Sequence, residues 1–115
     1  MRDSALTIED TAFAVAYCRA GPWLQDGVPH DILARAVVGT RGKKAAHAIG
    51  LSKADARATA VRTAQFDLLI KEFCERLPAA VVLNLGAGLD TRPYRLQLPS
   101  GVKFLEVDSA PLIAF

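Results

Sequence analysis

The chain has 115 residues, of which 51% are hydrophobic and 23% are charged, a composition typical of one folded globular domain and not of a disordered tail. Its 14 basic and 12 acidic residues leave a net charge of +2, which is too small to favour a nucleic-acid partner. The N-terminus lacks a basic start followed by an apolar run, so the sequence predicts neither a signal peptide nor a membrane span.

Helical patterns fill the first part of the chain. Thr7 is predicted to begin a helix as its capping side chain, and apolar residues recur at helical spacing as far as about Ala20. Asp31 can cap a short helix over residues 32–38, and another turn or two is expected within 42–49.

The two cysteines, Cys18 and Cys74, lie far apart in these helical stretches. They have no Cys-x-x-Cys spacing, and no nearby histidine completes a metal site. Both are predicted to be buried free thiols, so no metal is expected and a reducing cytoplasm fits. His30 and His47 have no partner at catalytic spacing.

The longest helical pattern runs over residues 53–77, between Ser52 and Pro78. If this helix packs antiparallel on the strand that follows, Arg62 lies about 22 Å back from Leu77, at about 1.5 Å per residue, and projects above the carboxyl end of that strand. On the helical wheel it faces the sheet and not open solvent. A guanidinium there can grip a carboxylate in a fork, although an arginine that only lies along the helix surface remains the alternative.

Beyond Pro78 the pattern changes to two short runs, 79–85 and 102–107, that are apolar on both faces, as in a buried parallel sheet. Pro93 and Pro99 leave room for little more than about one helical turn between them. The order helix, strand, short helix, strand predicts an α/β fold.

The stretch 84–96, NLGAGLDTRPYRL, is the most informative part of the chain. Gly86 and Gly88 have no Cβ, so backbone N–H groups can approach a ligand closely. A Gly-x-Gly alone is more often an ordinary turn between strand and helix, and the surrounding residues decide the interpretation. Asp108 lies 20 residues beyond Gly88, about the spacing at which the next parallel strand offers a carboxylate to ribose hydroxyls.

Two further features of this region narrow the choice of cofactor. Glu106 and Asp108 alternate onto the same face of the second strand, and Asp108 is favoured for the ribose because it sits at the strand tip. A dinucleotide fingerprint has a third glycine where this chain has Thr91. An NAD-type dehydrogenase fragment is therefore disfavoured, and a single nucleoside suits the short crossover better.

These residues, with Arg62-Thr63 and Phe66 upstream and Glu106-Val107-Asp108 downstream, resemble S-adenosylmethionine-dependent methyltransferases of the leucine carboxyl methyltransferase family, which includes bacterial O-methyltransferase-like members. The run GAGLDTRPYRL is specific, whereas the upstream part of the match is weak. The match covers most of the chain.

The resemblance implies S-adenosylmethionine as the cofactor. Gly86 and Gly88 would line its methionine and adenosine, Asp108 would hold the ribose hydroxyls, and Arg62 would pair with the methionine carboxylate. Asp90 either caps the short helix that begins near Thr91 or accepts a hydrogen bond from the cofactor's ammonium group. Arg19 approaches the site in the family, on a weaker sequence match.

The implied fold is a Rossmann-like class I methyltransferase sheet, of which this chain holds the N-terminal helices and the first strands. Residues 1–50 are expected to form a helical cap region, and residues 51–115 the start of the cofactor-binding domain. Two parallel strands leave two edges and half a core. We therefore expect an incomplete, N-terminal part of an enzyme that self-associates or lacks its C-terminal half.

The function implied is O-methyl transfer to a carboxylate or hydroxyl of a small molecule or peptide. The sulfonium is already an activated donor, so alignment of the acceptor can suffice, and no catalytic residue is assigned. A carboxylate acceptor needs no general base at neutral pH. The alternative is an inactive remnant or a partner-dependent binding module that associates through an exposed strand edge.

Overall fold

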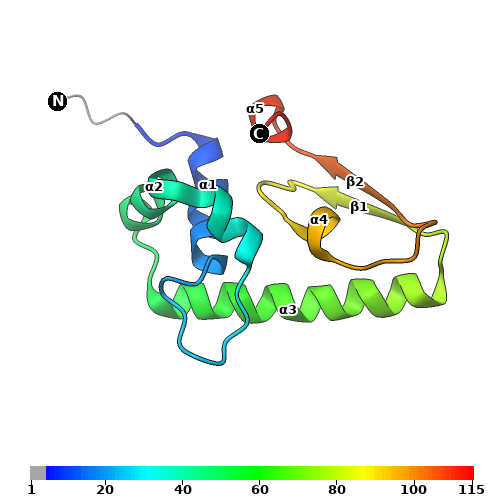
Figure 1. The fold of residues 1–115 in the computed structure, drawn as a ribbon. Helices are drawn as coiled ribbons and strands as arrows, with labels where there is room; N and C mark the ends of the chain where they lie inside the picture. The colour runs from blue at the N-terminus through cyan, green and yellow to red at the C-terminus, as the bar shows by residue number, and fades with distance from the viewer. Residues whose placement is uncertain (1–4) are drawn as a thin grey trace.

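A computed structural model of the protein describes residues 5–115, so the first four residues of the predicted cap region lie outside the described part. Helices and strands follow each other in the predicted order (Figure 1): α1 (Ile8–Arg19), α2 (Ile32–Ile49), α3 (Lys53–Arg76), β1 (Val81–Leu85), α4 (Arg92–Arg95), β2 (Lys103–Val107) and α5 (Ala110–Ile113). The prediction of an α/β fold is confirmed.

The helix starts predicted from capping side chains are confirmed. The hydroxyl of Thr7 accepts a hydrogen bond from the N–H of Asp10, whose carboxylate accepts from the N–H of Thr7 in return. Ser52 and Asp55 repeat this exchange at the start of α3. Asp31 caps α2 by accepting from the N–H of Ala34 at 3.0 Å.

The prediction of two short helices within residues 32–49 is confirmed. They follow each other within α2 and meet at Gly39, whose φ of 50° and ψ of −155° lie outside the helical region. Glycine takes a positive φ without the steric cost that other residues meet, so the chain turns there and the helix resumes at once. Gly50 then ends α2 in the left-handed conformation, with φ 81°.

The core of the described chain lies between α1 and α2 and is built mainly of small residues: Ala14, Ala16, Tyr17, Ala20, Ala34, Val38, Ala45 and Ala46. A Cβ added at Gly42 would lie 2.9 Å from the carbonyl oxygen of Phe13, so the two helices approach closely at that point. Cys18 and Cys74 are both buried and unpaired within the described chain, as predicted.

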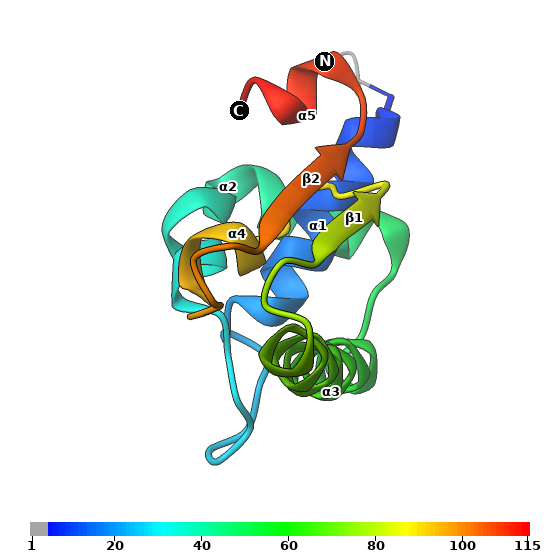
Figure 2. The ribbon, with the colours of Figure 1, turned by 90° about the vertical axis from the view of Figure 1, so that its right-hand side faces the viewer.

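The strands form a parallel pair, as predicted, with Val81 opposite Lys103 and Leu85 opposite Val107. Both strands begin later than predicted, because the N–H groups of Ala80 and Val102 donate to the carbonyls of Leu77 and Pro99 in the preceding turns. Helix α3 runs antiparallel to β1 and lies along one side of both strands (Figures 1 and 2).

The prediction that both faces of the sheet are buried is wrong for residues 5–115. The face that carries Val82, Asn84, Phe104 and Glu106 is half-buried, on the side of α3. The opposite face is open: Leu83 is 57% exposed and Leu85 is 70% exposed. No helix within 5–115 has the length and hydropathy needed to cross a membrane.

Candidate functional site

The loop after β1 is held to the tip of β2 by its own backbone. The N–H groups of Gly86 and Ala87 donate to the carbonyl of Val107 at 2.8 and 3.1 Å. Gly86 and Gly88 have φ of 66° and 56°, a backbone conformation that favours glycine. A Cβ at Gly88 would meet the Cβ of Ala12 at 3.3 Å, whereas no atom of residues 5–115 lies within 4 Å of the Cβ position at Gly86.

Because the N–H groups of both glycines are bonded within the chain, they are not free donors to a ligand as the sequence had suggested. Gly86 offers a ligand open space, and Gly88 gives the loop its curvature.

Asp108 joins the tip of β2 to this loop. Its Oδ2 accepts a hydrogen bond from the N–H of Gly88 at 2.6 Å, and its Oδ1 accepts from the N–H of Ser109 at 2.6 Å. The side chain also lines a hollow of about 370 Å³ together with Gly86 and Gly88. The predicted spacing thus brings this carboxylate directly to the glycine loop.

Glu106 lies in a different environment from Asp108, although the two share a strand face. Its Oε1 is buried and has no hydrogen-bond partner among the described residues. Burial raises the pKa of the Glu106 carboxyl, and the negative charge of Asp90 raises it further. Glu106 does not line the hollow that Asp108 lines, and the choice of Asp108 for the ribose stays a prediction.

A second hollow, of about 490 Å³, lies between α3 and the sheet and contains Arg62, Gly86 and Asp90. The two hollows adjoin, because Arg19, Gly86 and Ala87 line both of them. The five residues predicted from the sequence therefore surround one loop. Arg62 and Asp108 lie in different hollows, on either side of it.

Arg62 lies beside Gly86 and Asp90, as the geometry of an antiparallel α3 predicted. Its side chain is exposed, however, so the expectation that it avoids open solvent is wrong. No ion pair joins Arg62 to another side chain within residues 5–115. Its guanidinium is therefore available to an anionic group placed in the hollow.

Asp90 is tied to the residues around it. Its Oδ1 accepts from the N–H of Arg92 at 2.9 Å, and its Oδ2 accepts from Nη1 of Arg92 at 2.7 Å and from Nδ2 of Asn84 at 2.6 Å. It thus holds the first turn of α4, although the N-cap position belongs to Thr91. If Asp90 also accepts a hydrogen bond from an ammonium group, its carboxylate does so alongside the three hydrogen bonds that it already accepts.

Arg19, for which the sequence match was weak, lines both hollows and bonds to the loop. Its Nη2 donates to the carbonyl of Leu89 at 2.6 Å, and its side chain is 12% exposed. Burial lowers the pKa of Arg19, and the charge of Asp31 opposes that shift. Seventy positions separate Arg19 from Leu89, and only the fold brings them together.

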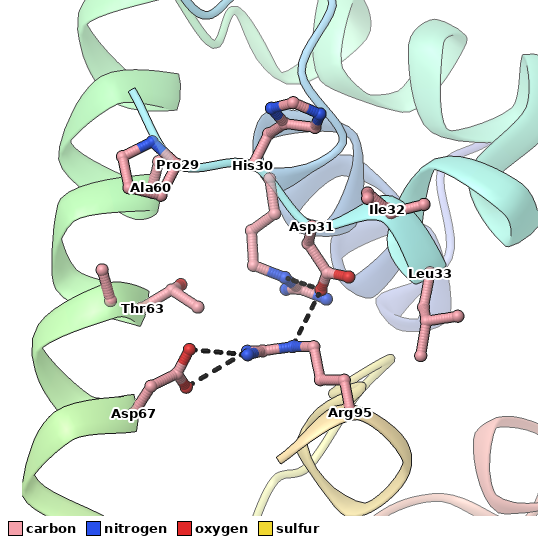
Figure 3. Close-up of a pocket in the computed structure, with 11 residues that line it drawn as sticks. Pro29, His30, Asp31, Ile32, Leu33, Ala60, Thr63, Asp67 and Arg95 are labelled. Carbon is pink, nitrogen blue, oxygen red and sulfur yellow. Dashed lines mark hydrogen bonds and ion pairs between the residues drawn. The ribbon is translucent and has the colours of Figure 1, made fainter. Parts of the chain in front are cut away.

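A third hollow, of about 220 Å³, lies between α3 and the start of α2. Figure 3 shows Arg95 paired with both Asp67 and Asp31 among the residues that line it. These charges are paired with one another, so this hollow offers a ligand few free polar groups. No three His, Cys, Asp or Glu side chains within residues 5–115 converge as metal ligands.

Comparison with known proteins places the amino-acid sequence in a family. The family model described as leucine carboxyl methyltransferase matches residues 9–115. Two relatives carry the name "Putative S-adenosyl-L-methionine-dependent methyltransferase". One, from Parafrankia sp. strain EAN1pec, is 37% identical over 118 residues, which cover 91% of this chain and 36% of the relative.

The other relative, from Mycobacterium marinum, is 40% identical over 58 residues, which cover 50% of this chain and 18% of the relative. The chain thus spans about a third of the length of the first relative. The family match extends from α1 to the last residue and includes the glycine loop, Arg62 and Asp108. The chain belongs to the leucine carboxyl methyltransferase family.

Proposed function

We propose that the glycine loop binds S-adenosylmethionine and that the protein functions in S-adenosylmethionine-dependent methyl transfer to an oxygen acceptor, as an enzyme or as the cofactor-binding N-terminal part of one. The observation that carries this proposal is the joining of Asp108 to the N–H of Gly88, with adjoining hollows on both sides of the loop. Family membership supports the choice of cofactor.

The residues present fit the chemistry of this cofactor. Arg62, exposed in one hollow, offers a guanidinium fork to the methionine carboxylate. Asp108, in the other hollow, offers a carboxylate to the ribose hydroxyls. Gly86 lies between them, where a Cβ would narrow the open space. Asp90 is assigned to the same site, as the support of the loop or as an acceptor for the ammonium group.

When bound, S-adenosylmethionine supplies a methyl group already activated for transfer by a positively charged sulfur. The chain's own residues then have to bind the cofactor, orient it toward the acceptor and exclude water from the site. Asp90 and Asp108 accept hydrogen bonds from neighbouring backbone N–H groups. These bonds hold each carboxylate in place, so that it can orient a bound cofactor. We infer a hydroxyl or carboxylate acceptor on a small molecule or peptide, since a carboxylate is ionised at neutral pH and needs no general base.

A second function, association with another chain, is supported by the uncovered apolar surface. Leu83, Leu85 and Leu105 are more than half exposed on one face of the sheet, and Phe66 and Phe73 of α3 are also more than half exposed. Surfaces of this kind mark interaction sites, and open strand edges can pair with a partner strand. Self-association is the simplest form of this function.

Calorimetric titration of the chain with S-adenosylhomocysteine tests the proposed cofactor site. We expect one binding site, and Asp108→Asn should weaken binding by about 1.5–3 kcal/mol, the usual range for hydrogen bonds to a charged group. Glu106→Gln is the matched control and should weaken binding less. Absence of binding to the folded chain, or a larger loss for Glu106→Gln, would contradict the assignment.

A further inference from the structure

Six charged residues form a connected cluster behind the glycine loop, which we call the arginine–aspartate network: Arg19, Asp31, Asp67, Asp90, Arg92 and Arg95. Each of these side chains is between 3% and 22% exposed. They come from α1, the start of α2, α3, the loop and α4, so the network joins the helices around the site to the loop.

Asp67 of α3 is the acceptor that both arginines of α4 share. Its Oδ1 accepts from Nε of Arg92 at 2.6 Å and from Nη2 of Arg95 at 3.1 Å, and its Oδ2 accepts from Nη1 of Arg95 at 2.6 Å. Arg92 also donates from Nη2 to the carbonyl of Thr63 on the same helix, at 3.4 Å. Two arginines thus fasten α4 to the middle of α3.

Further nitrogens of the same two guanidinium groups bind residues of the loop. Arg92 donates from Nη1 to Asp90 at 2.7 Å, and Arg95 donates from Nε to the hydroxyl of Thr91 at 2.8 Å. Burial lowers the pKa of Arg92, but the charges of Asp90 and Asp67 outweigh it and raise that pKa. Arg92 therefore stays charged and bridges the helix carboxylate to the loop carboxylate.

These side chains set the distance between α3 and the loop. Helices α3 and α4 are joined by the ion pairs of Asp67 with Arg92 and Arg95 and by the hydrogen bond from Arg92 to the carbonyl of Thr63. The hollow between them is lined by Arg62 on one wall and by Gly86 and Asp90 on the other. Asp67 lies five residues beyond Arg62 on the same helix, about 7.5 Å along its axis at about 1.5 Å per residue.

We propose that Asp67 is a positioning residue of the cofactor site, which acts through Arg92 and Arg95 to fix the spacing between Arg62 and the glycine loop. The inference rests on the proposed function, in which the hollow between these walls holds S-adenosylmethionine. Removal of the charge by Asp67→Asn leaves three guanidinium groups of the network with two carboxylates, and it replaces one of the two acceptor oxygens that the arginines of α4 share by an NH₂ donor.

Two measurements on Asp67→Asn test this role. Hydrogen–deuterium exchange without ligand should show faster exchange at residues 86–92, by about fivefold or more, with little change in α1 and α2. The dissociation constant for S-adenosylhomocysteine should rise about tenfold, a usual effect for a residue that supports others at a site. Asp67→Glu keeps the charge and should restore most of both properties.

Glu72→Gln, an exposed change on the same helix, is the matched control and should leave both measurements unchanged. If the unchanged chain does not bind S-adenosylhomocysteine, the proposed function is wrong, and loop exchange in Asp67→Asn still decides the positioning role. Unchanged loop exchange would overturn the inference. So would an equal loss of protection in α1, α2 and the loop, because Asp67 would then stabilise the whole fold.

Discussion

The helical cap encloses a core of small buried apolar residues, whereas the two-stranded sheet leaves one apolar face open. In the cap, Ala14, Ala34 and Ala46 are fully buried between closely packed helices. In the sheet, Leu83 and Leu85 are more than half exposed. Small side chains let α1 and α2 pack closely and cover each other's apolar faces. The large apolar side chains of the sheet are instead suited to contact with a further surface.

The candidate site lies where these two regions meet. Arg19 and Asp31 from the cap reach Leu89 and Thr91 of the loop, while Asp108 approaches the same loop from the sheet. The cap therefore serves both as a stable core and as one wall of the site. Changes in the cap should affect stability most, and changes on the open face of the sheet should affect association most.

Asp31→Ala should have the largest effect, because Asp31 connects the cap to the loop. The change removes the cap of α2, the acceptor of the Thr91 hydroxyl and the counter-charge of the buried Arg19. We expect a loss of about 3–5 kcal/mol, typical of a broken buried ion pair, measured by urea unfolding. Asp26→Asn, in the exposed loop before it, is the control; equal losses would contradict this account.

The same carboxyl predicts a pH dependence. Burial raises the pKa of Asp31, but hydrogen bonds from Thr91 and the N–H of Ala34, with the charge of Arg19, outweigh it and lower the pKa below its ordinary value. The stability it contributes is therefore present above the pKa of the unfolded carboxyl and is lost as the pH falls through the folded pKa. Asp31→Ala should flatten the acid limb of the stability curve.

Gly42→Ala should cost about 1–3 kcal/mol, the usual penalty for overpacking a core, because the new methyl would press on the carbonyl of Phe13 and the side chain of Val38. Thermal unfolding measures the loss. Lys43→Ala, exposed at the next position, should change stability by less than about 0.5 kcal/mol. A tolerated Gly42→Ala would show that the cap is packed more loosely than its alanines indicate.

Glu106→Gln should stabilise the protein at neutral pH. Burial and Asp90 raise the pKa of Glu106, so its ionised form costs stability above the folded pKa, and this cost disappears as the pH falls through that pKa. Removing the charge should add less than about 1 kcal/mol, because the side chain is only partly buried and solvent screens its charge. Urea unfolding measures it, with Glu75→Gln on α3 as control; a loss of stability would mean that Glu106 has a partner in solution.

Local signals in the sequence predicted much of this fold. Thr7, Ser52 and Asp31 marked helix starts because a capping side chain bonds to a backbone group only a few residues away. Short apolar runs predicted the parallel strands. A spacing of 20 residues predicted that Asp108 offers its carboxylate to ribose hydroxyls, which stays a prediction, and the structure adds a hydrogen bond from the N–H of Gly88 to that carboxylate.

Contacts between distant positions could not be predicted in this way. The bond between Thr91 and Asp31 spans 60 positions, and the bond between Arg19 and Leu89 spans 70. Nothing in the sequence near either partner marks the other. Strand periodicity placed Glu106 and Asp108 on one face, and only the structure shows that Asp108 bonds to the loop while Glu106 stays unpartnered among the described residues.

Leu85→Ser should have the smallest effect on stability and a large effect on association. Leu85 of the sheet is 70% exposed, and Ile32 of the cap is 71% exposed, so the two make a matched pair. Each change should alter unfolding free energy by less than about 0.5 kcal/mol. Leu85 lies beside the exposed Leu83 and Val107, whereas Ile32 begins a helix whose inner side is already covered.

If the open sheet face carries self-association, Leu85→Ser should weaken it about tenfold, as for a central residue of an interface, and Ile32→Ser should leave it unchanged. Sedimentation velocity over a range of protein concentrations measures both. An unchanged chain that remains a monomer at every concentration would contradict this function for the sheet. Equal weakening by both changes would show that self-association depends on exposed apolar area in general. The sheet face would then be no more important for self-association than the exposed apolar residues of the cap.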